Sequence, residues 1–332
     1  MNRIWKDIMA GLVMGMIVPG IVLNYAAAQL QPETEEIAVA AAAMAPESPE
    51  ETQSIENKLK VRLRNQSAEV IQWEMDAYLV GVVLAEMPAG FETEALKAQA
   101  VVARTYALKA YTTGGKHGDG SVCTQSGCCQ AYISEENYLK NRGTPKDVEK
   151  VRSAVLETSG YVLMYGGELI EATYFSCSGG QTEDAVAVWG TDFPYLRSVA
   201  SPGEENAAYY TGTTQMEGKE FCRLLGISPQ GSPNDWIEDI TYTSGGGIDE
   251  AVIGGKVFSG VQLRQLLGLR STAVSMQVQG QTIVLTTKGY GHRVGMSQYG
   301  ADAMAASGSN WRQILAHYYS GTEAVMWKAE SI

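Results

Sequence analysis

One stretch of the sequence has almost no polar face, and it limits the folds that are open to this chain. Residues 92–111 fit a helix in which nearly every position is apolar or small. A helix that is apolar on most sides must be enclosed by other elements. We therefore predict a fold built around one central buried helix.

The flanking segments predict an α+β fold, in which helices and antiparallel hairpins surround that helix. Upstream, a strand pair flanks residues 65–67, and a helix that Asp76 can cap is stopped by Pro88. Glycine pairs and proline positions mark the elements downstream. These are a helix over 145–160, a hairpin over 161–174, a helix-and-loop segment over 212–269 that is a possible subdomain, a hairpin over 275–285, and two short C-terminal helices.

The first 28 residues predict a membrane anchor with a short cytoplasmic N-terminus. The run from Ile8 to Ala28 is uncharged, and a membrane-spanning helix needs roughly 20 such residues. Arg3 and Lys6 precede the run and acidic residues follow it, so the rest of the chain is expected outside the cytoplasm. A cleaved signal peptide is the alternative, since the small residues 26–28 resemble a cleavage site.

Residues 29–57 predict a disordered acidic linker, followed by a folded domain over 58–332. The linker is rich in Glu, Ala, Pro and Ser and has almost no aromatic residues, so it cannot bury enough apolar surface to fold. Much of the net charge of −12 lies in this linker. The acidic balance argues against a nucleic-acid partner.

Glu86 is the first candidate for chemistry. It lies at the end of an apolar helix, directly before Met87-Pro88. Apolar neighbours and the negative end of the helix dipole both raise the pKa of a carboxyl group, as a general acid requires. The alternative is a solvated glutamate at a frayed helix end.

Gln99 and Arg104 are polar exceptions on the apolar helix. A charged side chain there must find a partner or a wet cleft. The residues alone leave two roles open, lining a binding site or forming a structural ion pair.

A cysteine-rich loop follows the apolar helix and predicts a zinc site. His117, Cys123 and Cys129 are the expected ligands, because thiolate and imidazole together suit tetrahedral zinc. Three protein ligands could leave a position open, although a structural role is the more modest expectation. The alternative is a disulfide from Cys123 to Cys128 or Cys129.

Small residues after an expected strand predict a place where a ligand approaches the backbone. Ser176, Ser178 and Gly179 form this turn, and Trp189 beyond it offers a stacking face for a sugar ring. His292 lies in a glycine-rich turn too small to form a core, so a site role is expected. An alternative interpretation is that Cys177 or Ser178 acts as a nucleophile with His292 as its base. His317 is expected at the edge of the core.

Several separated segments then resemble one family. Residues 78–88 (YLVGVVLAEMP) and 94–107 (EALKAQAVVARTYA) look like the signature of the stage II sporulation protein D family. Residues 174–183 (YFSCSGGQTE) with 188–190 (VWG) resemble its second block, and 289–301 (GYGHRVGMSQYGA) its third, which includes Gln298. With 263–272 (LRQLLGLRST), the resemblance spans about 58–322 in the family's order.

The resemblance implies a membrane-anchored lytic transglycosylase that cleaves peptidoglycan glycan strands during engulfment in sporulating bacteria. The family's acid/base glutamate falls on Glu86, its helix arginine on Arg104 and its strand-end tyrosine on Tyr174. Zinc on a His/Cys loop, found in some members, is implied for His117, Cys123 and Cys129. A partner amidase that first removes stem peptides is also implied.

The sequence departs from the family at Phe175, where histidine is common, and at Arg293, where glycine is common. Two other functions stay open. The same fold resembles amidase enhancers, which would bind the cell wall and activate a partner without cutting it. A hydrolase would need a second carboxylate, for which Glu183 and Asp184 are available.

Overall fold

The computed structural model describes residues 60–64, 70–141 and 143–327. The predicted anchor over 1–28 and the predicted linker over 29–57 lie outside these residues. Within the described part of the chain, no helix combines the length and the apolar character that crossing a bilayer requires. The observed mixture of helices and antiparallel sheets confirms the predicted α+β class.

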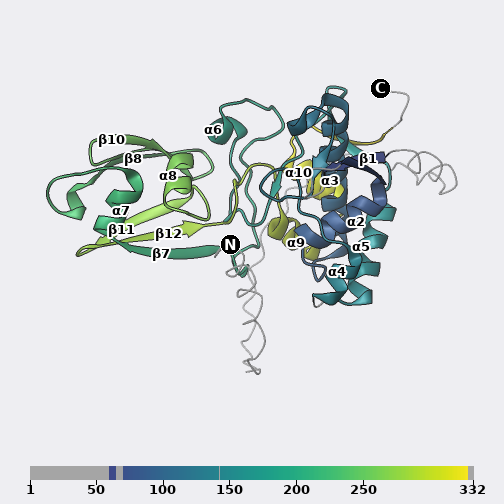
Figure 1. The fold of residues 1–332 in the computed structure, drawn as a ribbon, viewed down its shortest axis with the longest axis horizontal. Coiled ribbons are helices and arrows are strands. Elements are labelled where there is room, and N and C mark those ends of the chain that lie inside the picture. The colour runs from purple at the N-terminus through teal and green to yellow at the C-terminus, as the bar shows by residue number, and fades with distance from the viewer. Residues whose placement is uncertain (1–59, 65–69, 142, 328–332) are drawn as a thin grey trace, which may run out of the picture. The chain divides into compact units, whose positions relative to one another are not determined.

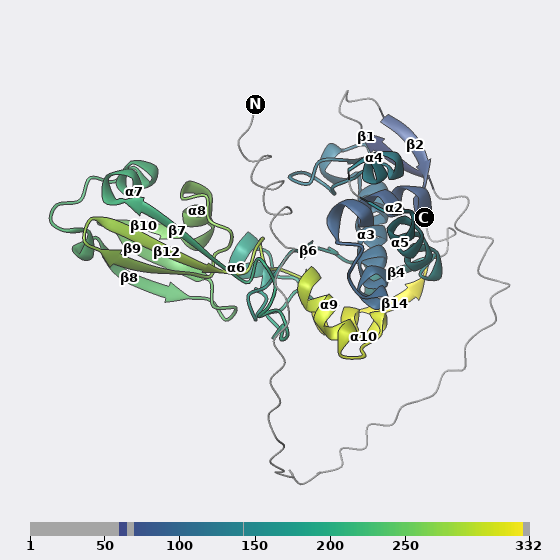
Figure 2. The same cartoon turned by 90° about the horizontal axis from the view of Figure 1, so that it is seen from below.

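The predicted apolar helix is α3 (Thr93–Thr113), and it is enclosed by other elements as expected. Helices α2 (Met75–Glu86) and α5 (Pro145–Glu157) pack along it, and α9 (Gln298–Ala306) and α10 (Trp311–Tyr318) cover it further along (Figures 1 and 2). The short helix α4 (Glu135–Lys140) packs on α2.

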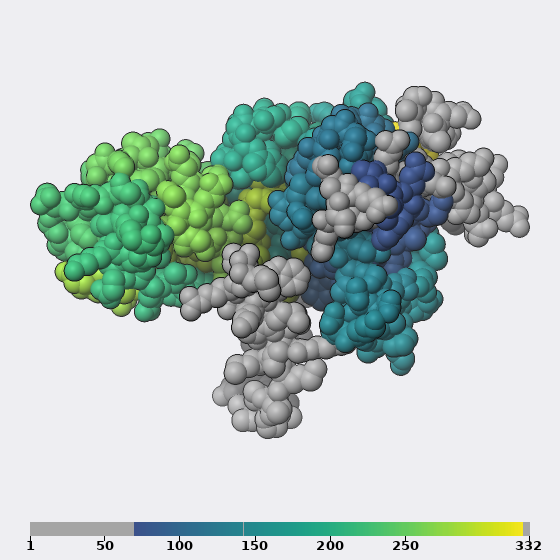
Figure 3. All heavy atoms as spheres, viewed as in Figure 1, coloured from purple at the N-terminus to yellow at the C-terminus, as the bar shows by residue number. Residues whose placement is uncertain are grey.

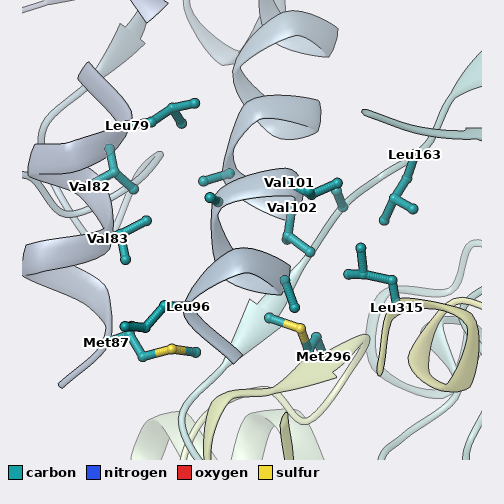
Figure 4. Close-up of a cluster of buried hydrophobic side chains, with 14 of the residues drawn as sticks. Leu79, Val82, Val83, Met87, Leu96, Val101, Val102, Leu163, Met296 and Leu315 are labelled. Carbon is teal, nitrogen blue, oxygen red and sulfur yellow. The ribbon is translucent and has the colours of Figure 1, made fainter. Parts of the chain in front are cut away.

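The core lies on both sides of α3. Figure 4 shows Leu79 and Val83 of α2 on one side of the helix and Leu163 and Leu315 on the other. All four side chains are fully or almost fully buried. Val102 of α3, which is also fully buried, is part of the same cluster. The apolar residues of α3 therefore belong to one buried cluster with those of the surrounding elements.

Arg104 has the structural role that the sequence left open. Its side chain is 1% exposed, and its guanidinium donates to the carbonyls of Val155 (3.3 Å) and Thr158 (2.8 Å) at the end of α5. It also pairs with Asp76 of α2 at 3.2 Å. The prediction that Asp76 caps α2 is therefore wrong. Glu74 occupies the capping position, and no side chain caps this end of the helix.

Three small sheets surround the helices. The first has the order β2-β1-β3, in which β1 (Lys60–Arg64) and β2 (Val70–Glu74) form the predicted antiparallel pair and β3 (Val122–Cys123) runs parallel to β1. The second has the order β14-β4-β5, and the third pairs β6 with β13 in parallel. Their strands are β4 (Tyr161–Tyr165), β5 (Glu168–Leu169), β6 (Tyr174–Phe175), β13 (Met296–Ser297) and β14 (Glu323–Met326).

The predicted hairpin over 161–174 is correct only at its turn. Strand β5 ends after two residues, and the chain then leaves β4 so that β6 can pair with β13 instead. This switch places Tyr174 next to the C-terminal glycine-rich segment.

Residues 211–288, which we call the insert, carry a second hydrophobic cluster that includes Phe221, Leu263 and Leu285. The predicted helix-and-loop segment over 212–269 is wrong, because four strands lie in it, and polar residues disguise them, as in β7 (TGTTQME). Whether 212–269 is a subdomain stays a prediction. The elements of the insert are β7 (Thr211–Glu217), α7 (Gly218–Leu225), the 3-10 turn Pro233–Asp235, β8 (Ile237–Tyr242), β9 (Ile248–Ile253), β10 (Lys256–Ser259), α8 (Gly260–Leu266), β11 (Val274–Gln279) and β12 (Thr282–Lys288).

Replacing Gly81 by alanine should destabilise the protein, although alanine is the better helix former. A Cβ at this position of α2 would lie 2.1 Å from a ring carbon of Tyr132 and 2.8 Å from the carbonyl oxygen of Ile133. We expect a loss of about 1–3 kcal/mol in the free energy of unfolding, measured by chemical denaturation. Gly90→Ala is the control, because nothing lies within 4 Å of the added carbon there. Equal effects of the two changes would contradict this packing.

Candidate active site

Glu86 lies at the last position of α2, where the sequence placed it. Met87 is extended and Pro88 follows, so the helix cannot continue. The carboxylate is half-buried and accepts a hydrogen bond from the backbone amide of Ala131 at 2.6 Å. Burial raises the pKa of the Glu86 carboxyl above its ordinary value, although hydrogen bonds from the Ala131 amide and the Tyr174 hydroxyl oppose the rise.

A chain of hydrogen bonds through Gln130 fixes the direction in which the Tyr174 hydroxyl donates. The Gln130 amide nitrogen donates to the carbonyl of Ala103 (3.5 Å) and to the Tyr174 oxygen (3.4 Å), while its own oxygen accepts from Tyr78 (2.8 Å). Because the Tyr174 oxygen already accepts from this amide, the hydroxyl is left to donate a hydrogen bond to the Glu86 carboxylate. Gln130 and Tyr78 thus position Tyr174.

Burial raises the pKa of Tyr174 well above its ordinary value, and the charge of Glu86 raises it further. Tyr174 therefore remains protonated, as a donor, at any pH near neutrality. Sequence reasoning missed Gln130, because its contacts come from segments far apart in the chain and no local pattern marks it.

The cysteine loop gathers four possible metal ligands. One ligand atom from each of His117, Cys123, Cys128 and Cys129 lies within 4.8 Å of the others. This set contains the three predicted ligands and adds Cys128, which sequence spacing did not single out. Three thiols and one imidazole match the donors of tetrahedral zinc sites, so the residues fit this metal. All cysteines of the chain are free, and the disulfide left open by the sequence is not formed.

The loop is also electrostatically suited to a cation. Although burial opposes ionisation, hydrogen bonds from the backbone of Gln125 and from His117 lower the pKa of Cys123 to about 7. A thiolate is therefore accessible near neutral pH, which is the form that binds a metal.

His292 and Trp189 lie together, as a binding surface would require. The ring centres of Trp189 and His292 are 5.3 Å apart, and the Phe175 ring lies 5.6 Å from that of His292. Burial, followed by the positive charge of Arg264, lowers the pKa of His292 to about 4. His292 is thus neutral at physiological pH. Trp189 is 41% exposed, so part of its side chain is available to a ligand.

The turn after β6 is built around a buried carboxylate. Glu204 accepts hydrogen bonds from the thiol of Cys177 (3.1 Å) and from the hydroxyl (2.9 Å) and amide (2.7 Å) of Ser178. Burial, and then the Glu204 charge, raises the pKa of the Cys177 thiol to about 12. Neither side chain is exposed, so the nucleophile reading of Cys177 or Ser178 is wrong, and Ser178 cannot reach a ligand from this position.

Gly179 and Ser176, on either side of this pair, have different surroundings. Gly179 is needed because its φ is +74° and an added Cβ would lie 2.6 Å from the amide nitrogen of Gly289. This close approach is to the protein's own backbone rather than to open space. Ser176 is half-buried, and its carbonyl accepts from the amide of Tyr299 at 3.0 Å.

Gln99 and Gln298 meet inside the fold. The Gln298 amide donates to the Gln99 oxygen at 3.5 Å, and Gln99 is fully buried. The amide nitrogen of Gln99 has no hydrogen-bond partner among the described residues. His317 is half-buried on α10 and contacts the Ala200 carbonyl at 2.7 Å, which confirms its predicted place at the core edge.

The backbone at Arg293 has a conformation that suits glycine, the residue that the resemblance implies at this position. Its φ is +66°, in the left-handed region that favours glycine. The guanidinium offsets this strain, since it donates to the carbonyls of Ser178 (2.8 Å), Gln181 (2.8 Å) and Gly245 (2.6 Å) and pairs with Glu183 at 3.1 Å.

Glu183 completes this buried network. Its carboxylate also accepts from the amide of Gly247 (2.9 Å) and the hydroxyl of Thr243 (2.7 Å) in the turn between β8 and β9. The pair therefore connects the loop after β6 to the insert. Asp184 accepts from the amide of Ser198 (2.9 Å) and the hydroxyl of Ser244 (2.6 Å). Both carboxylates have structural partners.

The candidate site thus brings together Glu86, Tyr174, His292 and Trp189. The β6 strand connects them, because Tyr174 contacts Glu86 through its hydroxyl and His292 through its backbone, and Phe175 contacts the His292 ring. Arg104 and Ser178, which were also predicted to belong to the site, have structural roles instead.

The family model and two of the most similar relatives all carry the description of stage II sporulation proteins. A family model described as "Stage II sporulation protein" matches residues 64–165. Stage II sporulation protein D of Bacillus subtilis is 40% identical over 267 residues, which cover 79% of this chain and 77% of that protein. The protein of the same name from Bacillus amyloliquefaciens is 39% identical over 79% of this chain and 76% of its own length. An amidase enhancer of Bacillus subtilis is 28% identical over 74% of this chain but 40% of its own length.

Replacing Arg293 by glutamine should destabilise the protein strongly. The change leaves the Glu183 carboxylate buried without its cation, and we expect a loss of about 3–5 kcal/mol in the free energy of unfolding. Arg223→Gln removes the exposed partner of Glu220 in the insert and should change stability little. Chemical denaturation of both variants measures the difference. Similar small effects would show that the buried pair does not hold this region together.

Proposed function

We propose a specific activity for this chain from the premise that it belongs to the stage II sporulation protein D family. It is a lytic transglycosylase that cleaves the glycan strands of peptidoglycan during sporulation. The supporting observation is the pair formed by Glu86, whose pKa is raised by burial, and Tyr174, which donates to it. A raised pKa keeps more of the carboxyl protonated near neutral pH, as a general acid needs.

Glu86 acts twice in the proposed mechanism. It first donates its proton to the glycosidic oxygen while the bond to the muramyl C1 breaks through an oxocarbenium-like state. The carboxylate then takes the proton of the 6-hydroxyl of the same sugar, whose oxygen bonds to C1. The products are a new free hydroxyl on the leaving sugar and an anhydro-muramyl end, and no water is consumed.

The contacts of Glu86 suit a group that changes its charge within one reaction. Burial favours the acid before the first step, and the donors Ala131 and Tyr174 stabilise the carboxylate after it. Tyr174 is therefore assigned a positioning and charge-stabilising role.

The structural partners of Glu183 and Asp184 favour a transglycosylase over a hydrolase. A hydrolase would need a second carboxylate for water activation or covalent attack. Glu183 is bound to Arg293, and Asp184 holds the amide of Ser198 and the hydroxyl of Ser244. The anhydro route needs Glu86 alone.

Sugar rings are proposed to bind on the exposed Trp189 ring beside His292. Ser176, which is half-buried, completes the proposed substrate contacts, whereas Gln99 and Gln298 are buried and contact each other inside the fold. Arg104, Ser178 and Gly179 are left out of this set, because their contacts serve the fold.

Zinc is proposed as a cofactor at His117, Cys123, Cys128 and Cys129. When bound, the ion would cross-link this loop and bring positive charge to it. The loop leads directly to Gln130 and Ala131, which contact Tyr174 and Glu86. The residues thus support a structural role for the metal.

The place of action is proposed from the sequence. The domain works outside the cytoplasm, in the intermembrane space during engulfment, held by the N-terminal anchor, and it acts with a cell-wall amidase that removes stem peptides.

A second candidate function is a non-catalytic activator of such an amidase. The relative named amidase enhancer favours it, although that relative is less similar than the stage II sporulation proteins D. In this case the site would bind glycan without cutting it.

Replacing Glu86 by glutamine should abolish glycan cleavage and leave glycan binding intact, because glutamine keeps the shape and loses the transferable proton. Purified glycan strands are digested and the products identified by mass. The wild-type chain should produce anhydro-muramyl ends.

Glu136→Gln, which changes an exposed glutamate of α4, is the matched control and should cleave like wild type. Cleavage by the Glu86 variant at the wild-type rate would refute the assignment. Ordinary reducing ends would indicate a hydrolase. Binding without cleavage by the wild-type chain, together with stimulation of an amidase, would establish the activator instead.

Replacing Cys129 by serine should remove the metal and lower the melting temperature. Elemental analysis of the wild-type chain purified with zinc should find about one ion per chain. Cys222→Ser is the control, because Cys222 packs against the second hydrophobic cluster, outside the four-ligand group. Wild-type zinc content in the Cys129 variant would contradict this site.

A further inference from the structure

Strand β7 lies at the edge of the insert, and its outer side is unpaired in the described part of the chain. The sheet to which it belongs has the order β11-β12-β7, so β12 is its one neighbouring strand there. The register between β7 and β12 is regular over all seven residues, from Thr211 opposite Lys288 to Glu217 opposite Thr282. Figure 1 draws β7 along one side of the insert, and Figure 3 shows green atoms of the insert at the molecular surface on that side.

The hydrogen-bond pattern shows which backbone groups of β7 point outward. The amide of Gly218 donates to the carbonyl of Gln281 at 2.8 Å, and the amide of Gly289 donates to the carbonyl of Tyr210 at 2.8 Å. These two bonds fix the phase of the antiparallel ladder, in which every second residue of β7 bonds to β12. The residues whose backbone N–H and C=O groups face away from β12 are therefore Thr211, Thr213, Gln215 and Glu217.

Strand β7 lacks the features that usually prevent a sheet edge from pairing. Lysines, prolines and β-bulges protect most edges, and the sequence TGTTQME contains none of them and one charge, at its end. The other three-stranded sheet of the insert differs. Its edge strand β8 (IEDITY) has acidic residues and register shifts against β9, and its edge strand β10 begins with Lys256. The insert thus protects one sheet and leaves β7 open.

The two ends of β7 carry opposite charges. The Glu217 carboxylate accepts a hydrogen bond from the Thr282 hydroxyl at 3.1 Å. Lys288, beside Thr211 at the other end, is exposed, and neither charge forms an ion pair within residues 60–64, 70–141 and 143–327. The two ends are six positions apart, which is roughly 20 Å along a strand, so Glu217 and Lys288 of one chain cannot meet.

We propose that β7 pairs with β7 of a second copy of this chain, antiparallel and with the two-fold axis at Thr214. In this register Thr213 exchanges backbone hydrogen bonds with Gln215 of the second copy, and Thr211 lies opposite Glu217 of the second copy. The outward-facing groups of both strands gain partners, and the two sheets become one continuous sheet.

The charges favour a second copy over an unrelated strand. Thr211 would lie between Lys288 of its own chain and Glu217 of the second copy, so the two charges leave the same face of the sheet with one residue between them. Long side chains such as these can reach past a single neighbour. The contact occurs twice, once at each end, because the arrangement is two-fold symmetric. Strand β11, at the opposite edge, is uncharged along its length and offers no such match.

Charge reversal tests the pairing, because Glu217 and Lys288 come close only between copies. Association of the full chain in detergent is measured by analytical ultracentrifugation over a range of concentrations. Wild type should form dimers, and Glu217→Lys or Lys288→Glu should each weaken the dimer about tenfold, since each places like charges together twice. The double variant Glu217→Lys/Lys288→Glu should associate like wild type. Glu250→Lys, at an exposed position of β9, is the control and should change nothing.

A cysteine on the symmetry axis gives a readout that does not depend on charge. Thr214 would face Thr214 of the second copy in a non-hydrogen-bonded pair, whose Cα atoms lie about 4.5 Å apart, within the range of a disulfide. Thr214→Cys should therefore cross-link two chains when oxidised by molecular oxygen. Ser275→Cys, on the edge strand β11, should stay at the wild-type background. Both positions are exposed, so both variants should fold.

Any of four results would overturn this pairing. A wild-type chain that stays monomeric at every concentration would do so, and so would a double variant that associates as weakly as the single ones. Equal cross-linking of Thr214→Cys and Ser275→Cys would show that β7 is not the preferred edge. Association that no β7 variant alters would place the contact elsewhere in the chain.

Discussion

The enclosure of α3 is the constraint on which the rest of the structure depends. A helix with almost no polar face needs neighbours on nearly every side, and each polar atom that it carries must then be met from outside. The fold supplies partners for several of these atoms, although the amide nitrogen of Gln99 has no hydrogen-bond partner among the described residues. Thr105, for example, accepts the amide of Leu163 at 2.9 Å, and Arg104 holds the ends of α2 and α5 together. Packing of α2 against α3 is also what carries Glu86 into a half-buried position.

The pKa of Glu86, on which the proposed acid chemistry depends, is then set by burial, which raises it, and by hydrogen-bond donors, which lower it. The helix end buries Glu86, and a loop from elsewhere in the chain supplies the opposing hydrogen bonds. That loop has two anchors, the Gln130 side chain on one side and the His117–Cys129 cluster on the other. The proposed metal and the proposed acid therefore belong to one structural unit, even though the chemistry passes through the acid alone.

Sequence reasoning succeeded where the physical signal is local. The periodicity of α3, the proline after Glu86 and the glycine turns of the hairpins are visible in short windows. It failed where the outcome depends on distant segments. No local sequence pattern identifies Gln130 as a site residue. Strand β6 pairs with β13 instead of completing the predicted hairpin, and the polar strand β7 forms because it pairs with β12. Arg104 and Ser178 illustrate the same difficulty. The sequence around a buried polar residue does not show whether its partner is a ligand or another part of the protein.

The strand pairing at the base of the insert bears on how the chain can fold. Ser176 and Ser297 meet although they are 121 positions apart, and closing so long a loop in an unstructured chain is slow and entropically unfavourable. Thr211 and Lys288, however, are direct partners in one sheet. Once the insert has formed, its own sheet holds its two ends together, and only residues 177–210 and 289–296 remain as flexible connections in the loop. An early-folding insert would thus shorten the search that brings β6 and β13, and with them Tyr174 and His292, into place.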